Sequence, residues 1–291
     1  MSKKTPEDPT GQGSNRKRAT RRFNRRLKSA KKQVLRLFSR IPRERRTVAP
    51  IANTTVYDYD VQQPLDAEIR SIIDNALQTS TDQPPVDWWY SQEVELPYRQ
   101  GTIEATQEFN QGLEAAIIAG LLLASPATRS IEPDSVIAGR VYRQRLRSVI
   151  IDNYNSIKGL STETATQLIN RINSGIRAGK TPTDIKADIT GRFDVADSKA
   201  KRIVVTEVNT AYNNARMNVT KDLSQVTGVK TAVRHISALL PTTREWHAAR
   251  HRKIYTVEDQ RQWWDSDSNR INCHCVANPV FLDSKNNPLT I

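Results

Sequence analysis

Apolar residues recur every three or four positions between residues 19 and 41, which is the spacing of one face of an α-helix. They are Phe23, Leu27, Ala30, Val34, Leu37 and Ile41. Most positions between them are Lys or Arg, and Pro42 cannot continue a helix. The pattern predicts an amphipathic helix over residues 19–41. The preceding residues, 1–18, are polar, and we expect them to be disordered.

The next segment mixes a strand pattern with a helix pattern. Alternation predicts a short strand over residues 55–61, and apolar spacing predicts a helix from about Leu65. The adjacent aromatics Trp88, Trp89 and Tyr90 are expected to anchor a core or an interface. A longer helix is predicted over residues 102–124. Its end, residues 115–124, is apolar on every side, so we expect other helices to surround it.

The rest of the middle region is patterned as four helices. They are predicted at residues 135–156, 162–178, 182–193 and 196–223. Ser161 and Thr181 are the expected N-caps of the second and third, and Gly179 is expected to end the second. After residue 228 the composition changes. Alternation near residues 229–236 predicts a strand, and residues 229–291 hold all four histidines and both cysteines.

These patterns predict a mainly α protein divided along the chain. Residues 1–46 form a basic arm, residues 47–94 a linker with a short helix, and residues 95–228 a helical domain. Residues 229–291 form a small α+β module. The two cysteines in 291 residues exclude a disulfide-framed scaffold. No apolar run reaches the roughly 18–20 residues needed to cross a bilayer, and no signal peptide is evident. We expect a protein made in a reducing cytoplasm, without a membrane partner.

Charge is concentrated at the N-terminus. The chain has 44 Lys and Arg against 31 Asp and Glu, and residues 1–46 alone hold 17 of the former and 3 of the latter. A basic amphipathic helix can bind nucleic-acid phosphates, lie on an anionic membrane, dock on a partner, or pack on its own chain. We favour phosphates, or an acidic partner surface, bound without sequence preference. The expected contacts are Arg16, Lys17, Arg18, Arg21, Arg22, Arg25, Arg26, Lys28, Lys31, Lys32 and Arg36, with Phe23, Leu27, Val34 and Leu37 as the candidate docking face.

Candidate metal ligands lie in the C-terminal module. His247 and His251 are four residues apart, so on a helix they share a face, and Cys273 and Cys275 follow. Two histidines and two cysteines could hold zinc tetrahedrally. The favoured alternative has no cofactor: the cysteines are small buried apolar residues and the histidines make ordinary hydrogen bonds. A Cys–His nucleophilic pair is a third interpretation. Ala248 replaces the glutamate of a metalloprotease motif, and no phosphate-binding glycine loop is present.

A polar stripe runs along the helix predicted at residues 196–223. Glu207, Thr210 and Asn214 fall on one side of it. We favour a solvated face. The alternative is a buried hydrogen-bonding ridge that orients the C-terminal module.

Several stretches resemble the Mu-F-type family of phage head morphogenesis proteins, also called minor head or minor capsid proteins. The first runs from Gly179 to Phe193 and leads into the helix with Thr206 and Glu207. The second is residues 243–247, Thr-Arg-Glu-Trp-His, with residues 251–255 after it. The third is residues 272–275, Asn-Cys-His-Cys, and residues 98–102 are also similar. The resemblance spans about residues 95–282 and gives Thr206, Glu207 and Arg244 as structural motif residues.

The resemblance implies a low-copy virion protein inside the head near the portal, assembled in the host cytoplasm before or during DNA packaging. The implied partners are the portal protein, the major capsid protein or scaffold, and packaged double-stranded DNA. Leu240, Thr242, Arg252, Arg270 and Ile271 depart from the family pattern. These losses favour a non-enzymatic role in head morphogenesis, in which the basic arm links the portal or capsid shell to DNA. The alternative is an enzyme with a C-terminal His/Cys site acting on nucleic acid or transferring a group.

Overall fold

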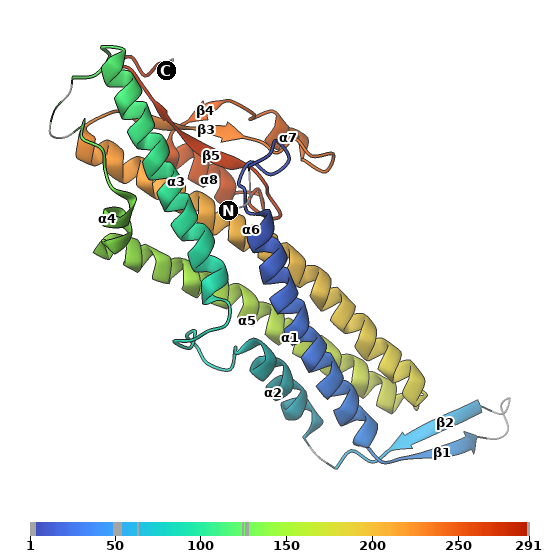
Figure 1. The fold of residues 1–291 in the computed structure, drawn as a ribbon. Coiled ribbons are helices and arrows are strands. Elements are labelled where there is room, and N and C mark those ends of the chain that lie inside the picture. The colour runs from blue at the N-terminus through green and yellow to red at the C-terminus, as the bar shows by residue number, and fades with distance from the viewer. Residues whose placement is uncertain (1–3, 49–53, 63, 124, 126–127, 290–291) are drawn as a thin grey trace. The chain divides into compact units, whose positions relative to one another are not determined.

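The computed structural model describes residues 4–48, 54–62, 64–123, 125 and 128–289 (Figure 1). The fold is mainly α, as predicted. The helices are α1 (Gly13–Arg40), α2 (Leu65–Leu77), α3 (Ser91–Ile118), α4 (Pro133–Ala138), α5 (Arg140–Arg177), α6 (Pro182–Thr227), α7 (Glu245–Ala248) and α8 (Val257–Asp265). The strands are β1 (Arg43–Val48), β2 (Thr54–Tyr59), β3 (Thr231–Ile236), β4 (Ile254–Tyr255) and β5 (Val276–Phe281).

The chain forms two compact units, each assembled from separate stretches. Unit 1 comprises residues 1–18, 90–150 and 204–291, and unit 2 comprises residues 19–89 and 151–203. Helices α1, α5 and α6 therefore each contribute residues to both units. This division cuts across the consecutive domains expected from sequence. In particular, most of the expected basic arm belongs to unit 2.

The apolar face of α1 lies inside the core of unit 2. Its buried residues are Ala19, Phe23, Leu27, Ala30, Val34 and Phe38. The Phe23 ring meets the Trp89 ring edge-on at 5.3 Å between centroids, and Trp88 meets Tyr154 at 5.2 Å. The predicted helix is confirmed, with an earlier start at Gly13. The docking face is corrected, because the side chains of Phe23, Leu27 and Val34 are buried against the chain itself.

A two-stranded hairpin follows α1. β1 and β2 pair antiparallel, with Arg43 opposite Tyr59 and Val48 opposite Thr54. The Tyr57 N–H donates to the carbonyl of Gly179 (3.1 Å). Gly179 ends α5 with φ +59°, as its predicted role requires, and a Cβ there would meet Val56. The second strand confirms the prediction at residues 55–61, whereas β1, with its basic sequence, was not predicted.

Unit 1 packs α3 and the C-terminal half of α6 with a small sheet. Gly101 lets α3 approach α6 closely, because a Cβ at Gly101 would lie 2.4 Å from the Tyr212 carbonyl oxygen. The core includes Phe109, Leu113, Val219 and Phe281. The sheet has the order β4-β3-β5, and both pairings are antiparallel. The α+β character predicted for residues 229–291 is confirmed.

Four helices predicted separately are partly fused. α5 joins most of 135–156 to 162–178, and α6 joins 182–193 to 196–223. Ser161 is buried within α5, where its hydroxyl donates to Asp74 Oδ1 (2.7 Å) instead of capping a helix. Thr181 does cap α6, because its hydroxyl accepts from the Asp184 N–H (3.1 Å).

The apolar end of α3 is exposed rather than surrounded. Ile118 is 80% exposed and Leu123 is 89% exposed, and Leu121 is also exposed. The expectation that helices surround this stretch is therefore wrong for these residues, while Ala124 lies outside the described residues. No described helix is both long and apolar enough to cross a membrane.

The segment before α1 is ordered from Lys4 onwards, which corrects the expected disorder for the described part of residues 1–18. Asp8 is the reason: its Oδ2 accepts from the Gly13 N–H (2.8 Å) and its Oδ1 accepts from the Thr10 hydroxyl (2.7 Å). The carboxylate thus satisfies a backbone donor at the start of α1. Residues 1–3 lie outside the described part.

Candidate functional site

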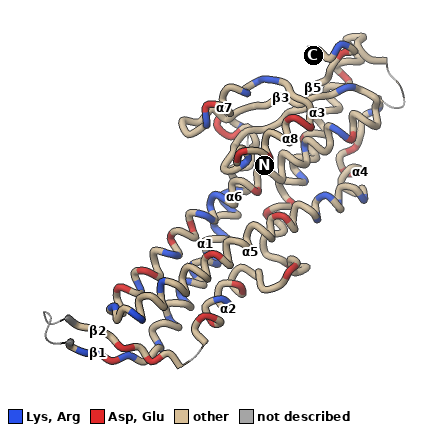
Figure 2. The backbone as a smooth tube through the Cα atoms, turned by 180° about the vertical axis from the view of Figure 1, so that it is seen from behind, with Lys and Arg blue, Asp and Glu red and all other residues tan. Residues whose placement is uncertain are grey.

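One candidate site is the solvent-facing side of α1. The helix contains 12 Lys and Arg and no Asp or Glu (Figure 2). Within unit 2, its exposed basic residues recur every three or four positions, which places them along one line opposite the buried face. We call this line the basic stripe: Arg21, Arg25, Lys28, Lys32 and Arg36. It spans about 22 Å along the helix axis.

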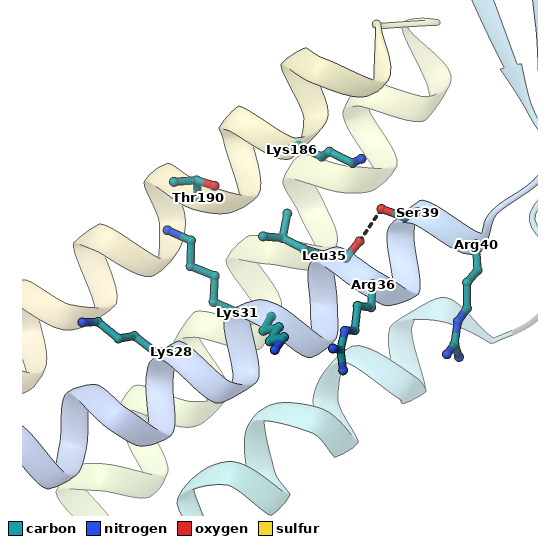
Figure 3. A pocket seen from close by; sticks show the side chains of 9 residues that line it. Lys28, Lys31, Leu35, Arg36, Ser39, Arg40, Lys186 and Thr190 are labelled. Carbon is teal, nitrogen blue, oxygen red and sulfur yellow. Dashed lines mark hydrogen bonds between the residues drawn. The ribbon is translucent and has the colours of Figure 1, made fainter.

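Beside the stripe lies a basic groove of about 690 Å³, shown in Figure 3. Its lining combines α1 with α6, and no acidic residue takes part: Lys28, Lys31, Lys32, Leu35, Arg36, Ser39, Arg40, Lys186 and Thr190. Lys31 extends from α1 toward the α6 residue Thr190 (Figure 3). Lys31 also lies 3.6 Å from Asp194. The groove therefore concentrates positive charge on one side of unit 2.

The other Lys and Arg residues predicted to bind phosphates differ in how far they already contact the protein itself. Arg16 pairs with Asp8 (3.0 Å), and Arg18 pairs with the buried Glu93 (2.9 Å). Arg26 lies over the Trp89 ring at 4.6 Å and donates to the Ala76 carbonyl. Arg22 is half-buried, and Lys17 is exposed but belongs to unit 1. Arg16, Arg18 and Arg26 thus have structural partners that the sequence pattern did not indicate.

A buried polar ridge on α6 holds the segment that leads into β5. The Thr206 hydroxyl accepts from the Asn272 N–H (2.9 Å), and Asn209 Nδ2 donates to the Cys273 carbonyl (2.7 Å). One turn later, Asn213 Nδ2 donates to the Cys275 carbonyl (3.0 Å). The buried hydrogen-bonding ridge that was the alternative interpretation of this helix therefore exists, but it is formed by a neighbouring line of residues. Glu207, Thr210 and Asn214, where it was expected, are half-buried.

Arg216 completes the ridge as its only charged member among the described residues. Its Nε donates to the Ala277 carbonyl (3.0 Å), and its Nη2 contacts both Glu108 and Asn278 Oδ1. Burial alone would lower the pKa of Arg216, but Tyr212 and Glu108 outweigh it and raise the pKa. Because the guanidinium is fully buried, its charge is compensated inside the fold and is not offered to a ligand.

The second candidate site is a buried cluster of histidine and cysteine. Ligand atoms of His235, His247 and Cys275 lie within 4.8 Å of one another. His247 Nδ1 is 3.5 Å from Cys275 Sγ and 3.6 Å from Cys273 Sγ. All four side chains are buried. They come from β3, from α7 and from the residues just before β5, so the sheet and the ridge bring them together.

The structure corrects one member of the predicted metal set. Helix α7 ends at Ala248, so His251 does not share a helix face with His247. Instead, His251 Nδ1 accepts from the Ser237 N–H (3.2 Å). His235 takes its place in the cluster. The sequence pattern could have indicated that His235 is buried, because alternation along the predicted strand puts it on the same side as the buried Val233.

Arg244, the predicted motif residue, fixes the surroundings of this cluster. Its Nη2 donates to the Ile271 carbonyl (2.9 Å), and its Nη1 lies 3.3 Å from His247 Nε2. Since a guanidinium can only donate, His247 Nε2 accepts and Nδ1 carries the proton, facing the sulfur atoms. The hydrogen bond from the Cys273 thiol lowers the pKa of Cys275, and His247 adds to this effect. The pKa of Cys273 is raised by its bond to Cys275 and by burial.

The space next to the cluster is small. A cavity of about 60 Å³ lies beside the cluster. Its lining residues are Ala238, Leu240, Thr242, Thr243, Arg244, His247, Asn272, Cys273, His274 and Cys275. A volume of this kind holds only a few water molecules. It is too small for a nucleotide next to the thiols, so the geometry favours a buried structural cluster over a nucleophile that attacks a large substrate.

Comparison with known proteins identifies one family. Residues 166–278 match the family described as Phage Mu protein F like protein. The matched region includes α6 with its polar ridge, the sheet up to β5, and the His/Cys cluster. The match confirms the resemblance over this region, which is less than half of the chain. No curated protein and no solved structure matches the chain.

Proposed function

Because residues 166–278 are a Mu F-like region that relates the chain to phage heads, we propose that the protein is a minor head component whose basic groove binds packaged DNA. The observation that carries this proposal is the joint arrangement of the basic stripe and the basic groove. Five exposed cations follow one helix face, and the adjoining groove adds Lys31, Arg40 and Lys186 without an acidic lining residue. Such a surface is complementary to a phosphate backbone.

The chemistry of this surface favours binding without sequence preference. Lys and Arg contacts to phosphates release counterions from DNA, which supplies affinity that does not depend on base identity. No aromatic residue lines the groove, so base stacking does not contribute there. An acidic protein surface offers fewer aligned anions than DNA, whose two strands carry one charge per about 1.7 Å of axis.

In this proposal the protein acts without catalysis during head morphogenesis. It lies inside the head near the portal and links the portal or the capsid shell to DNA. The family relation supports the head, and the small cavity beside the His/Cys cluster supports the absence of an enzymatic role.

Salt-dependent DNA binding by the full-length protein tests the groove. Removing residues 1–46 is unsuitable, because it would also remove Phe23, Leu27 and Val34 from the core. We instead neutralise the basic stripe, whose side chains are exposed and whose loss leaves the buried face intact. The test variant combines R21Q, R25Q, K28Q, K32Q and R36Q. A matched control removes five exposed charges elsewhere: R140Q, R147Q, R171Q, R177Q and K253Q.

The stripe variant should bind DNA more weakly. Its plot of log affinity against log salt should become less steep by up to about 4.5, the slope expected for five lost phosphate contacts. The control should retain most of the slope. Equal affinity and slope for the stripe variant and the unmodified protein would refute the DNA-binding role. Quantification against the portal protein in nuclease-treated particles tests the head assignment separately, since a head component must be present at a reproducible ratio.

A further inference from the structure

We propose that His235, His247, Cys273 and Cys275 bind one Zn²⁺, which fastens β3 and α7 to the segment that enters β5. This inference is independent of DNA binding, because it concerns residues of unit 1 that do not line the basic groove. It is carried by the distances, the burial and the hydrogen bonds of the cluster.

The distances around His247 Nδ1 agree with a tetrahedral site. With Zn–S about 2.3 Å and Zn–N about 2.05 Å, a nitrogen and a sulfur ligand of one zinc ion lie about 3.5 Å apart. His247 Nδ1 lies 3.5 Å from Cys275 Sγ and 3.6 Å from Cys273 Sγ. Ligand atoms of His235, His247 and Cys275 all lie within 4.8 Å of one another, and Cys273 Sγ, which lies outside that group, would move closer to its other members when the ion binds. Two nitrogens and two sulfurs are the donor set of many structural zinc sites.

His235 provides the second, independent observation. Its Nδ1 is 3.2 Å from Gln260 Oε1, which also accepts from Arg250 Nη2 (3.3 Å). Because Arg250 can only donate, Oε1 is an acceptor, and His235 Nδ1 therefore carries the proton. The lone pair is left on Nε2, which is fully buried and forms no hydrogen bond to any described residue. A buried imidazole nitrogen oriented by an outer carbonyl is typical of a metal ligand.

The charges balance when zinc binds. The Cys273 thiol gives up its proton, Cys275 binds as the thiolate, and two thiolates neutralise the ion. His247 moves its proton from Nδ1 to Nε2, so Arg244 must leave Nε2 and keep its bond to the Ile271 carbonyl (2.9 Å). Proton release makes the affinity fall at acidic pH. Thiolate and imidazole ligands in a tetrahedral arrangement favour zinc over the hard cations Mg²⁺ and Ca²⁺.

A metal has a structural purpose at this position. β4 has two residues, and α7 has four, so neither is stable on its own. Zinc would join His235, His247, Cys273 and Cys275 at one point and add a constraint that the short elements lack. Such a site contributes directly to folding stability.

The first experiment measures metal in the full-length protein. Protein purified without chelators should contain one zinc per chain, and Co²⁺ replacing it should give the intense visible absorption of a tetrahedral site with thiolate ligands. Trp263 offers a second signal, because its ring lies 4.7 Å from the His247 ring and 5.3 Å from the His235 ring. Bound Co²⁺ should therefore quench tryptophan fluorescence, and W263F should reduce this quenching, while Trp264 and Trp246, whose rings lie 5.9 Å from His235 and 6.2 Å from His247, still contribute.

Variants then assign the ligands. C275S and H235Q should weaken zinc binding by more than the roughly 10- to 100-fold that the loss of an outer partner costs, and Q260L should fall within that range. H251Q is the matched control: it removes a nearby histidine outside the cluster and should keep full occupancy. If ligand variants fail to fold, the cobalt spectrum of the unmodified protein still shows whether a tetrahedral site with thiolate ligands exists. Protein without stoichiometric metal, without thiolate-to-cobalt absorption, or with equal affinity in C275S and H251Q would overturn the proposal.

Discussion

The side-chain amide of Asn213 hydrogen-bonds the backbone around Ala277 in the way that a neighbouring strand would. Its Oδ1 accepts from the Ala277 N–H (3.1 Å), while its Nδ2 donates to the Cys275 carbonyl (3.0 Å). β5 is an edge strand of the sheet, so no strand among the described residues pairs with these backbone groups on that side. One buried amide on α6 therefore satisfies a donor and an acceptor that burial would otherwise leave without partners.

We expect N213L to destabilise unit 1 by about 2–4 kcal/mol, because leucine leaves two buried backbone groups unsatisfied. Urea unfolding followed by circular dichroism measures this loss. N214L is the control: Asn214 is the next residue on α6 and is half-buried, so its effect should be much smaller. Similar losses for both variants would show that the hydrogen bonds to β5 are not the cause.

The buried face of α1 predicts a second contrast. F23A should cost about 3–5 kcal/mol, because it opens a cavity beside Trp89 in the core of unit 2. L37A should cost clearly less, because Leu37 is only half-buried. Thermal unfolding compares them. A free α1 that docks on a partner would instead leave the stability of the isolated F23A protein unchanged.

Two glycines within helices should respond to alanine in opposite directions. In G101A the new Cβ would clash with the Tyr212 carbonyl, and we expect a loss of about 1–3 kcal/mol. In G159A nothing lies within 4 Å of the new Cβ, so higher helix propensity should stabilise α5 by up to about 1 kcal/mol. Denaturant midpoints of the two variants should therefore move apart, and a stable G101A would contradict the close approach of α3 and α6.

Asp8 makes stability depend on acidity. Burial would raise the pKa of Asp8, but hydrogen bonds from Thr10, Arg16 and Gly13 and the charge of Arg16 outweigh it and hold the pKa below its usual value of 3.8. The stabilisation is thus complete above pH 3.8 and is lost as the pH falls through the lower, folded-state pKa.

D8N should accordingly be less stable than the unmodified protein by about 1–2 kcal/mol at pH 7, the value of a few charge-assisted hydrogen bonds. The gap should close when unfolding is measured in more acidic buffers below pH 3.8. A gap that stays constant down to pH 2 would mean that the carboxylate charge contributes nothing.

Local signals were sufficient for much of the fold. Pro42, Gly179 and Thr181 determine helix boundaries through their own backbone or side chain. The ends of α1 and α5 and the start of α6 could therefore be predicted. Ser161 could not, because a residue type that caps helices instead donates to Asp74, which is remote in sequence. Likewise, the period of α1 reveals an apolar face, but whether that face meets its own chain or another molecule depends on residues such as Trp89.

The candidate sites divide in the same way. The cations of the basic stripe are adjacent on one helix, and their spacing alone predicted a common face. The His/Cys cluster depends on strand pairing, which brings His235 close to residues about forty positions later. The spacing of His247 and His251 predicts a helix that contains both, but α7 ends at Ala248. The histidine that lies beside His247 in the cluster is therefore His235 and not His251.

The bond between Arg16 and Asn209 sets the order in which the protein can fold during synthesis. Asn209 accepts from Arg16 Nη1 (2.8 Å) and in turn donates to the Cys273 carbonyl. At about 5–20 residues per second, Arg16 leaves the ribosome roughly ten seconds or more before Asn209 does. Until then the first turns of α1 lack this partner, and the 12 Lys and Arg of the helix belong to an incomplete fold. Unit 1 therefore closes only after the residues around Cys273 have left the ribosome.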